Sequence, residues 1–146
     1  MTVAVAVLLI DDEDQARAAL ADRLRRFRRL ELIDAVRDER EAAGALSKAE
    51  PDVLLVDLHS RHGEDDGVQL CSELHRMASA PLVVLTSFMT DERWQRLRAV
   101  GVANCLLKRV DSGRLERELV LVGTKYSSPT VASEEGRDEA LRSSDL

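Results

Sequence analysis

The sequence predicts a doubly wound α/β fold, in which a parallel sheet carries helices on both faces. Five short apolar runs alternate along the chain with segments in which apolar residues recur every three or four positions, and this alternation is typical of βα units. Three of the runs are continuous and rich in Val, Leu and Ile, as strands buried on both faces are. The length of 146 residues suits one such domain.

The apolar runs are the expected strands. The first, third and fourth runs are the most continuously apolar and should be central, whereas the second and fifth should lie at the edges of the sheet. The first run is too short to cross a membrane, has no basic flank before it and is followed by four acidic residues, which favours a buried strand over a signal peptide. The five strands are expected at residues 3–10, 30–36, 53–57, 82–86 and 104–107.

Helical segments separate the strands, so the chain should contain five helices. Pro51 ends the second helix before the third strand, and Gly101 follows the end of the fourth. After residue 122 the apolar periodicity fades into Ser, Pro and Glu, which predicts a linker or tail over residues 123–146. The helices are expected at residues 14–29, 39–49, 67–79, 91–100 and 112–122.

Composition and charge limit the classes of function. The chain is 45% hydrophobic and 33% charged, as folded proteins are, and its net charge of −6 argues against a nucleic-acid surface of its own. The arginines of residues 23–29 are better explained as cations at a helix C-terminus. Cys71 and Cys105 are too few for a disulfide framework and are expected to be free thiols of a cytoplasmic protein with no membrane contact.

Three carboxylates are expected to meet at one rim of the sheet. Asp11 and Asp12 end the first strand and Asp57 ends the third, and ligands of such sheets sit at the carboxyl ends of the strands. Two like charges about 4 Å apart repel by roughly 4 kcal/mol at an effective dielectric near 20, so a divalent cation or a raised pKa is expected. Oxygen ligands with open positions favour Mg²⁺.

A hydroxyl and a cation complete this set of residues. Thr86 ends the fourth strand and Lys108 follows the fifth, and both side chains can bind phosphoryl oxygens. An acidic pair, a third acid, a hydroxyl and a lysine at successive strand ends form a specific pattern, although each residue alone would be a weak signal.

On these residues the chain resembles the response-regulator receiver family over about residues 3–122. The resemblance implies a flavodoxin-like sheet of order 2-1-3-4-5, with residues 1–122 as the receiver domain. It also implies that the protein takes part in two-component signal transduction with a sensor histidine kinase as partner. The matching stretches are residues 7–13, 51–58, 84–87 and 106–108.

The family resemblance also assigns roles to individual residues. It implies that Asp57 is the phosphoacceptor, with Asp12 binding Mg²⁺ directly and Asp11 through water, and with the Asp57 carboxylate and the His59 backbone carbonyl as further ligands. Lys108 and Thr86 are implied to contact the phosphoryl oxygens. Thr86 is further implied to move inward and reposition the face made by the fourth helix, fifth strand and fifth helix. Such a protein catalyses its own aspartyl phosphorylation and dephosphorylation and is a switch rather than an enzyme.

The chain departs from the family pattern at two places. Cys105 stands where receivers usually carry the aromatic switch residue, and the loop after Asp57 is longer than usual and lacks a proline. We interpret Cys105 as a strand thiol rather than a redox sensor, because no sequence feature indicates a lowered pKa. His59 and His62 are better interpreted as part of a solvated loop than as a zinc pair, since no third ligand follows at metal spacing.

The residues after the last expected helix bear on the output of the switch. Residues 123–132 resemble the linker of NarL/LuxR-type regulators, which implies a transcriptional regulator that contacts DNA only through an output domain absent from this chain. The family resemblance also implies a homodimer. A stand-alone receiver and a phosphorylation-independent receiver remain alternatives. A phosphohydrolase would need an Asp where His59 stands, and a flavodoxin would need a phosphate-binding loop in place of the acidic residues after the first strand.

Overall fold

The computed structural model describes residues 3–59 and 64–127. Five parallel strands form one sheet in the order β2-β1-β3-β4-β5, as the sequence predicted. The most buried strands are β1, β3 and β4, and β2 and β5 are the edges. The strands are β1 (Val5–Ile10), β2 (Leu30–Val36), β3 (Val53–Leu58), β4 (Leu82–Thr86) and β5 (Val102–Leu107).

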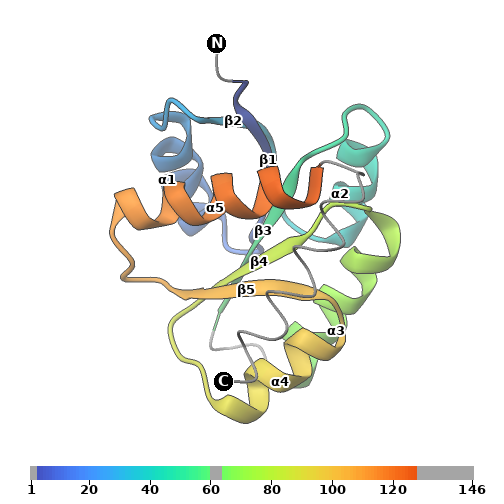
Figure 1. Cartoon of the computed structure of the whole chain (residues 1–146). Coiled ribbons are helices and arrows are strands. Elements are labelled where there is room, and N and C mark those ends of the chain that lie inside the picture. The colour runs from blue at the N-terminus through green and yellow to red at the C-terminus, as the bar shows by residue number, and fades with distance from the viewer. Residues whose placement is uncertain (1–2, 60–63, 128–146) are drawn as a thin grey trace.

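Five helices cover the two faces of the sheet (Figure 1). One core cluster joins the sheet to α1 and α5, and the other joins it to α2, α3 and α4. Among the described residues no helix is long and apolar enough to span a membrane. The helices are α1 (Asp14–Arg25), α2 (Glu39–Leu46), α3 (Glu64–Met77), α4 (Asp91–Ala99) and α5 (Ser112–Ser127).

Strand alternation divides the core between the two faces. Successive side chains of a strand point to opposite faces, so in β1 Val7 and Leu9 belong to the cluster with α1 and α5, whereas Leu8 and Ile10 belong to the other. All four are fully buried or nearly so. The continuous apolar run that predicted a central strand therefore supplies both cores at once.

The expected end of the folded unit was placed too early. Residues 123–127, expected to begin a linker, form the last turn of α5. Gly123 permits this, because a Cβ there would lie 2.4 Å from Cγ1 of Val5 in β1. Residues 128–146, the rest of the expected linker, lie outside the described residues.

Local signals fix the ends of several helices. Oδ1 of Asp38 accepts a hydrogen bond from the backbone N–H of Glu41 at 3.0 Å, and Oγ1 of Thr90 accepts one from Arg93 at 3.1 Å, so both are N-caps. Gly101 follows α4 with φ of 106°, a conformation that favours glycine. These caps hold α2 and α4 at fixed starting points on the sheet.

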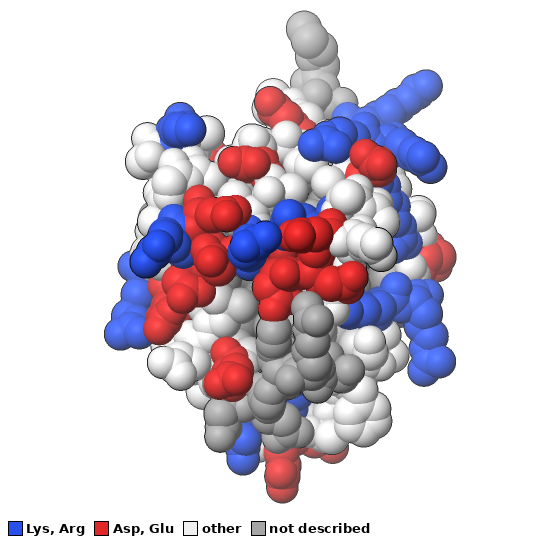
Figure 2. Space-filling model, turned by 180° about the vertical axis from the view of Figure 1, so that it is seen from behind, with Lys and Arg blue, Asp and Glu red and all other residues white. Residues whose placement is uncertain are grey.

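One face of the molecule carries a group of acidic side chains. Seen from the side opposite to Figure 1, Asp and Glu gather near the middle of the surface (Figure 2). Such a grouping creates a negative local potential that attracts cations.

Candidate functional site

The predicted carboxylates meet at the carboxyl end of the sheet. Asp11 follows β1, and its backbone N–H donates to the carbonyl of Val36 at 2.9 Å. Its Oδ1 accepts a hydrogen bond from the backbone N–H of Glu13 at 3.0 Å, which fixes the carboxylate at the start of the turn. Asp11 is 1% exposed and Asp57, within β3, is 7% exposed, whereas the side chain of Asp12 keeps 35% exposure. Two of the three acids are therefore buried in the protein.

Lys108 supplies the cation at this site. Its Nζ lies 2.8 Å from Oδ1 of Asp57, and its backbone N–H donates to the carbonyl of Thr86 at 2.8 Å. The pKa of the Asp57 carboxyl is nevertheless raised above its ordinary value, chiefly because burial disfavours the carboxylate. The neighbouring charge of Asp11 adds to this rise, and the hydrogen bond from Lys108 opposes it. The single ammonium of Lys108 thus does not balance the carboxylates of the pocket.

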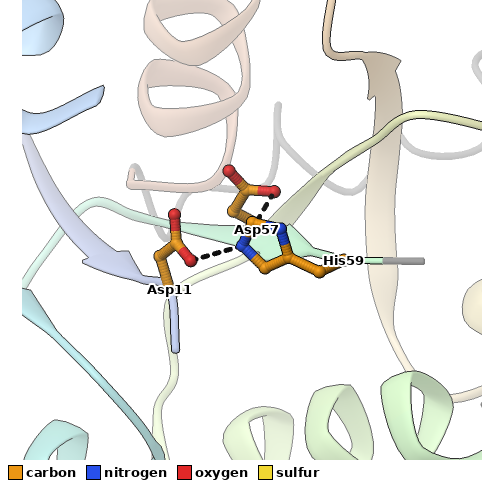
Figure 3. A group of neighbouring side chains, drawn as sticks. All are labelled: Asp11, Asp57 and His59. Carbon is orange, nitrogen blue, oxygen red and sulfur yellow. Dashed lines mark hydrogen bonds and ion pairs between the residues drawn. The ribbon is translucent and has the colours of Figure 1, made fainter. Parts of the chain in front are cut away.

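The side chain of His59 enters the pocket, which the sequence did not predict (Figure 3). Its Nε2 lies 2.5 Å from Oδ1 of Asp11, and its Nδ1 lies 3.0 Å from Nζ of Lys108. The side chain is 12% exposed, so the expectation of a solvated loop residue is wrong for His59. The reason is electrostatic, because the ring finds an acceptor on one side and a donor on the other. The predicted role of its backbone carbonyl stays a prediction, and His62 lies outside the described residues.

A cavity of about 270 Å³ opens beside these groups. Its wall includes Asp11, Asp12, Asp57 and His59, together with Gly67 and Leu70 of α3. Hence the acids face a space large enough for an ion with its water or for a phosphoryl group.

Comparison with known proteins identifies the fold and the family together. The family model for the response regulator receiver domain matches residues 7–120. The chain belongs to the response-regulator receiver family. The match spans β1 to α5 and includes the carboxylates, Thr86 and Lys108.

Two curated relatives of this receiver are transcriptional regulators. The DNA-binding transcriptional activator DevR/DosR of Mycobacterium tuberculosis is 29% identical over 124 residues, which cover 84% of this chain and 56% of that protein. LiaR of Bacillus subtilis, a transcriptional regulatory protein, is 33% identical over 105 residues, which cover 71% of this chain and 49% of LiaR. The chain spans about half the length of these relatives.

Solved structures confirm the fold of the receiver. The receiver domain of a modulated diguanylate cyclase from Desulfovibrio desulfuricans G20 aligns with a TM-score of 0.69 and 27% identity, over 84% of this chain and 96% of that one. The receiver domain of a putative response regulator NarL from M. tuberculosis aligns with a TM-score of 0.70 and 18% identity, over 84% and 98%.

One buried residue of the receiver was missed by sequence reasoning. Four polar or charged residues are buried in the described part of the chain, and three of them, Asp11, Asp57 and Thr86, were predicted site residues. The fourth is Arg93 of α4, which is 8% exposed. Its position four residues before Leu97 places it on the buried stripe of the helix, and an arginine in that stripe is the signal that was available.

Arg93 binds the residue that the family resemblance implies to be the switch. Nη1 of Arg93 donates to Oγ1 of Thr86 at 3.3 Å and to the backbone carbonyl of Phe88 at 3.2 Å. The Thr86 hydroxyl in turn donates to the carbonyl of Phe88 at 3.3 Å. In this structure Thr86 is therefore connected to the start of α4 by hydrogen bonds.

Cys105 of β5 lies half-buried in the α4 side of the core. Burial raises the pKa of its thiol to about 11 and that of Cys71 to about 12. Because the thiolate is the reactive form, these values support the interpretation of both cysteines as structural thiols. The predicted switch role of Cys105 stays a prediction.

Proposed function

We propose that this receiver is a response regulator in which Asp57 accepts a phosphoryl group from a sensor histidine kinase in a Mg²⁺-dependent reaction. The observation that carries the proposal is the buried Asp57 carboxylate, 2.8 Å from Nζ of Lys108 and beside a second buried acid, Asp11. A nucleophile, a cation and a divalent-metal site in one pocket suit phosphoryl transfer.

The pocket residues fit a divalent cation. Oδ2 of Asp11 is buried and has no hydrogen-bond partner in the described part of the chain, and such a buried acceptor is costly unless something binds it. Asp11, Asp12 and Asp57, with the His59 backbone carbonyl, would hold the ion. Bound there, Mg²⁺ supplies charge neutralisation for the phosphoryl oxygens.

The protein's own groups account for the transfer step. A carboxylate oxygen of Asp57 attacks phosphorus, a P–O bond forms, and the P–N bond to the kinase imidazole breaks with its electron pair on that nitrogen. Lys108 stabilises the oxygens that gain charge, and burial of Asp57 limits the access of water to the acyl phosphate. Self-catalysed phosphorylation and later hydrolysis follow from the same groups.

The output is proposed to pass through Thr86 and α4. A phosphoryl group on Asp57 competes with Arg93 and Phe88 for the Thr86 hydroxyl. Phosphorylation should therefore weaken the hydrogen bonds that now connect Thr86 to α4. The α4–β5–α5 face then changes its shape. We propose that this cytoplasmic protein controls transcription through this face and a helix-turn-helix domain outside this chain, because two curated relatives are transcriptional regulators of which the matched region covers only about half.

A second candidate is a receiver that works without phosphorylation, alone or by contact with a protein partner. The observation that favours it is the His59 ring, which lies between Asp11 and Lys108 where the transfer groups should meet. Cys105 stands where receivers usually carry the aromatic switch residue, and this also favours a receiver that works without phosphorylation.

The test is incubation with a small phosphoryl donor and Mg²⁺, read by intact mass. We expect a gain of one phosphoryl group in the wild type and none in Asp57→Asn or without Mg²⁺. No gain under conditions that modify another receiver would favour the phosphorylation-independent candidate.

A further inference from the structure

We propose that the His59 side chain is a metal ligand, so that this pocket binds a late first-row divalent cation of the Zn²⁺ class more tightly than Mg²⁺. The proposal relies on the proposed function only for the premise that the pocket holds a divalent cation. It concerns the imidazole nitrogen of His59, which is separate from the backbone carbonyl considered above.

The ligand atoms are close enough to share one ion. One side-chain ligand atom from each of Asp11, Asp57 and His59 lies within 4.8 Å of the others. From Nε2 of His59 the distances are 2.5 Å to Oδ1 of Asp11, 3.8 Å to Oδ1 of Asp12 and 3.9 Å to Oδ1 of Asp57. With metal–ligand bonds of about 2.0–2.2 Å, one ion can be reached by the nitrogen and the carboxylates after small adjustments.

Burial points independently to a ligand in this space. The side chain of Asp11 has 0% exposure and that of Asp57 has 6%, and Oδ2 of Asp11 lacks a hydrogen-bond partner among the described residues. A carboxylate that is buried and only partly satisfied is expensive for the fold. A cation bound by Asp11 and His59 together removes that cost.

The hydrogen bonds show what must change when His59 binds a metal. The ammonium of Lys108 can only donate, so Nδ1 of His59 accepts from it at 3.0 Å and Nε2 carries the proton given to Asp11. Nε2 can bind a metal only when its proton is elsewhere. Metal binding therefore requires the proton to be on Nδ1. The hydrogen bond from Lys108 to Nδ1 is then lost, because two donors would face each other, and Lys108 keeps its ion pair with Asp57.

The kind of ion follows from the donor atoms. Carboxylate oxygens alone suit Mg²⁺, which loses its water reluctantly, whereas an imidazole nitrogen suits Zn²⁺ and its neighbours in the first row. Zinc accepts both imidazole nitrogen and carboxylate oxygen as ligands. The pocket should therefore discriminate against Mg²⁺ through His59.

The first measurement is the affinity of the metal-free protein for Zn²⁺ and, separately, for Mg²⁺, by calorimetry without a phosphoryl donor. His59→Gln retains a side-chain N–H that can donate to Asp11 but removes the imidazole. We expect this variant to lose on the order of 100-fold in Zn²⁺ affinity and to bind Mg²⁺ within about threefold of the wild type. The matched control is His75→Gln, at an exposed histidine of α3, which should change neither affinity.

The second measurement is the tautomer of His59, from the nitrogen chemical shifts of its ring. We expect the proton to move from Nε2 to Nδ1 on addition of Zn²⁺ but not of Mg²⁺. His59→Ala repeats the affinity test if the glutamine variant does not fold, with folding checked by circular dichroism.

Two results would overturn the proposal. Unchanged Zn²⁺ affinity in folded His59 variants would show that the imidazole is not a ligand. A rise in Mg²⁺ affinity without loss of Zn²⁺ affinity would show that the ring only blocks the pocket. Because neither measurement involves phosphorylation, both are independent of the mass experiment on Asp57, and either proposal can fail alone.

Discussion

Asp57 is a buried acid whose ammonium partner, Lys108, keeps 28% exposure of its side chain. Its pKa is raised, first because of burial and then because of the Asp11 charge. The folded protein therefore binds the Asp57 proton more tightly than the unfolded chain does. Ionised Asp57 thus lowers stability at neutral pH, and this penalty disappears as pH falls through the raised pKa toward the ordinary value of 3.8.

We therefore expect Asp57→Asn to raise the melting temperature at pH 7 in the presence of a chelator. The gain should shrink as the pH is lowered through 3.8, below which the wild-type carboxyl is protonated in both states. Thermal unfolding of both proteins across this pH range measures the effect. A less stable variant at pH 7 would mean that the ion pair with Lys108 outweighs the cost of burial.

Lys108 should matter more for transfer than for folding. Lys108→Met removes the cation that faces Asp57 at 2.8 Å, and we expect phosphorylation by a small donor to slow by about 10²-fold or more, as when one charge-stabilising donor is lost. The rate of phosphoprotein formation, followed by mass, tests this. Arg109→Met, at the exposed neighbouring residue, is the control and should react at the wild-type rate.

At the scale of elements, α4 is connected to the site by Arg93. Because Arg93 donates to both Thr86 and Phe88, we expect Arg93→Met to change the amide chemical shifts of β4 and α4 in the unphosphorylated protein toward those of the phosphorylated wild type. Arg93→Lys retains one donor and should restore part of the difference. Identical spectra for wild type and Arg93→Met would show that hydrogen bonds from Arg93 do not connect Thr86 to α4.

Helix α5 depends on close contact with β1. A Cβ at Gly123 would lie 2.4 Å from Cγ1 of Val5, so we expect Gly123→Ala to destabilise the protein by about 1–3 kcal/mol through overpacking. Gly44 in α2 is exposed and has no neighbour within 4 Å of a built Cβ. Gly44→Ala should therefore stabilise by about 0.5–1 kcal/mol, and denaturant unfolding of the two variants compares the effects.

At the scale of the whole molecule, ion binding and folding are linked. The net charge is −6, and buried carboxylates add to the repulsion within the folded chain. A divalent cation at 100 times its dissociation constant should raise the free energy of unfolding by about 2.7 kcal/mol. Asp11→Asn should lose most of this increase, and an equal increase in both proteins would place the ion elsewhere.

The sequence by itself determined the strand order, the two-sided core and the convergence of the carboxylates. The order came with the family resemblance, and the rest followed from local patterns. Continuous apolar runs predict central strands, and the carboxyl ends of parallel strands meet at one rim. For this reason the structure brings Asp11 and Asp57 together with Lys108 as expected. The end of α5 was misplaced, because the contact that allows Gly123 to continue the helix lies in β1, far away in the sequence.

Only the tertiary structure decided the positions of His59 and Arg93. No local pattern indicates that His59 is buried, and the sign available for Arg93 was its spacing of four residues from Leu97. His59 turns inward because Asp11 and Lys108, distant in sequence, offer an acceptor and a donor on opposite sides of its ring. Arg93 is buried because Thr86 and Phe88 satisfy its guanidinium in part. Such partners exist only once the sheet has formed, and therefore the fold, rather than the local sequence, sets the chemistry of this pocket.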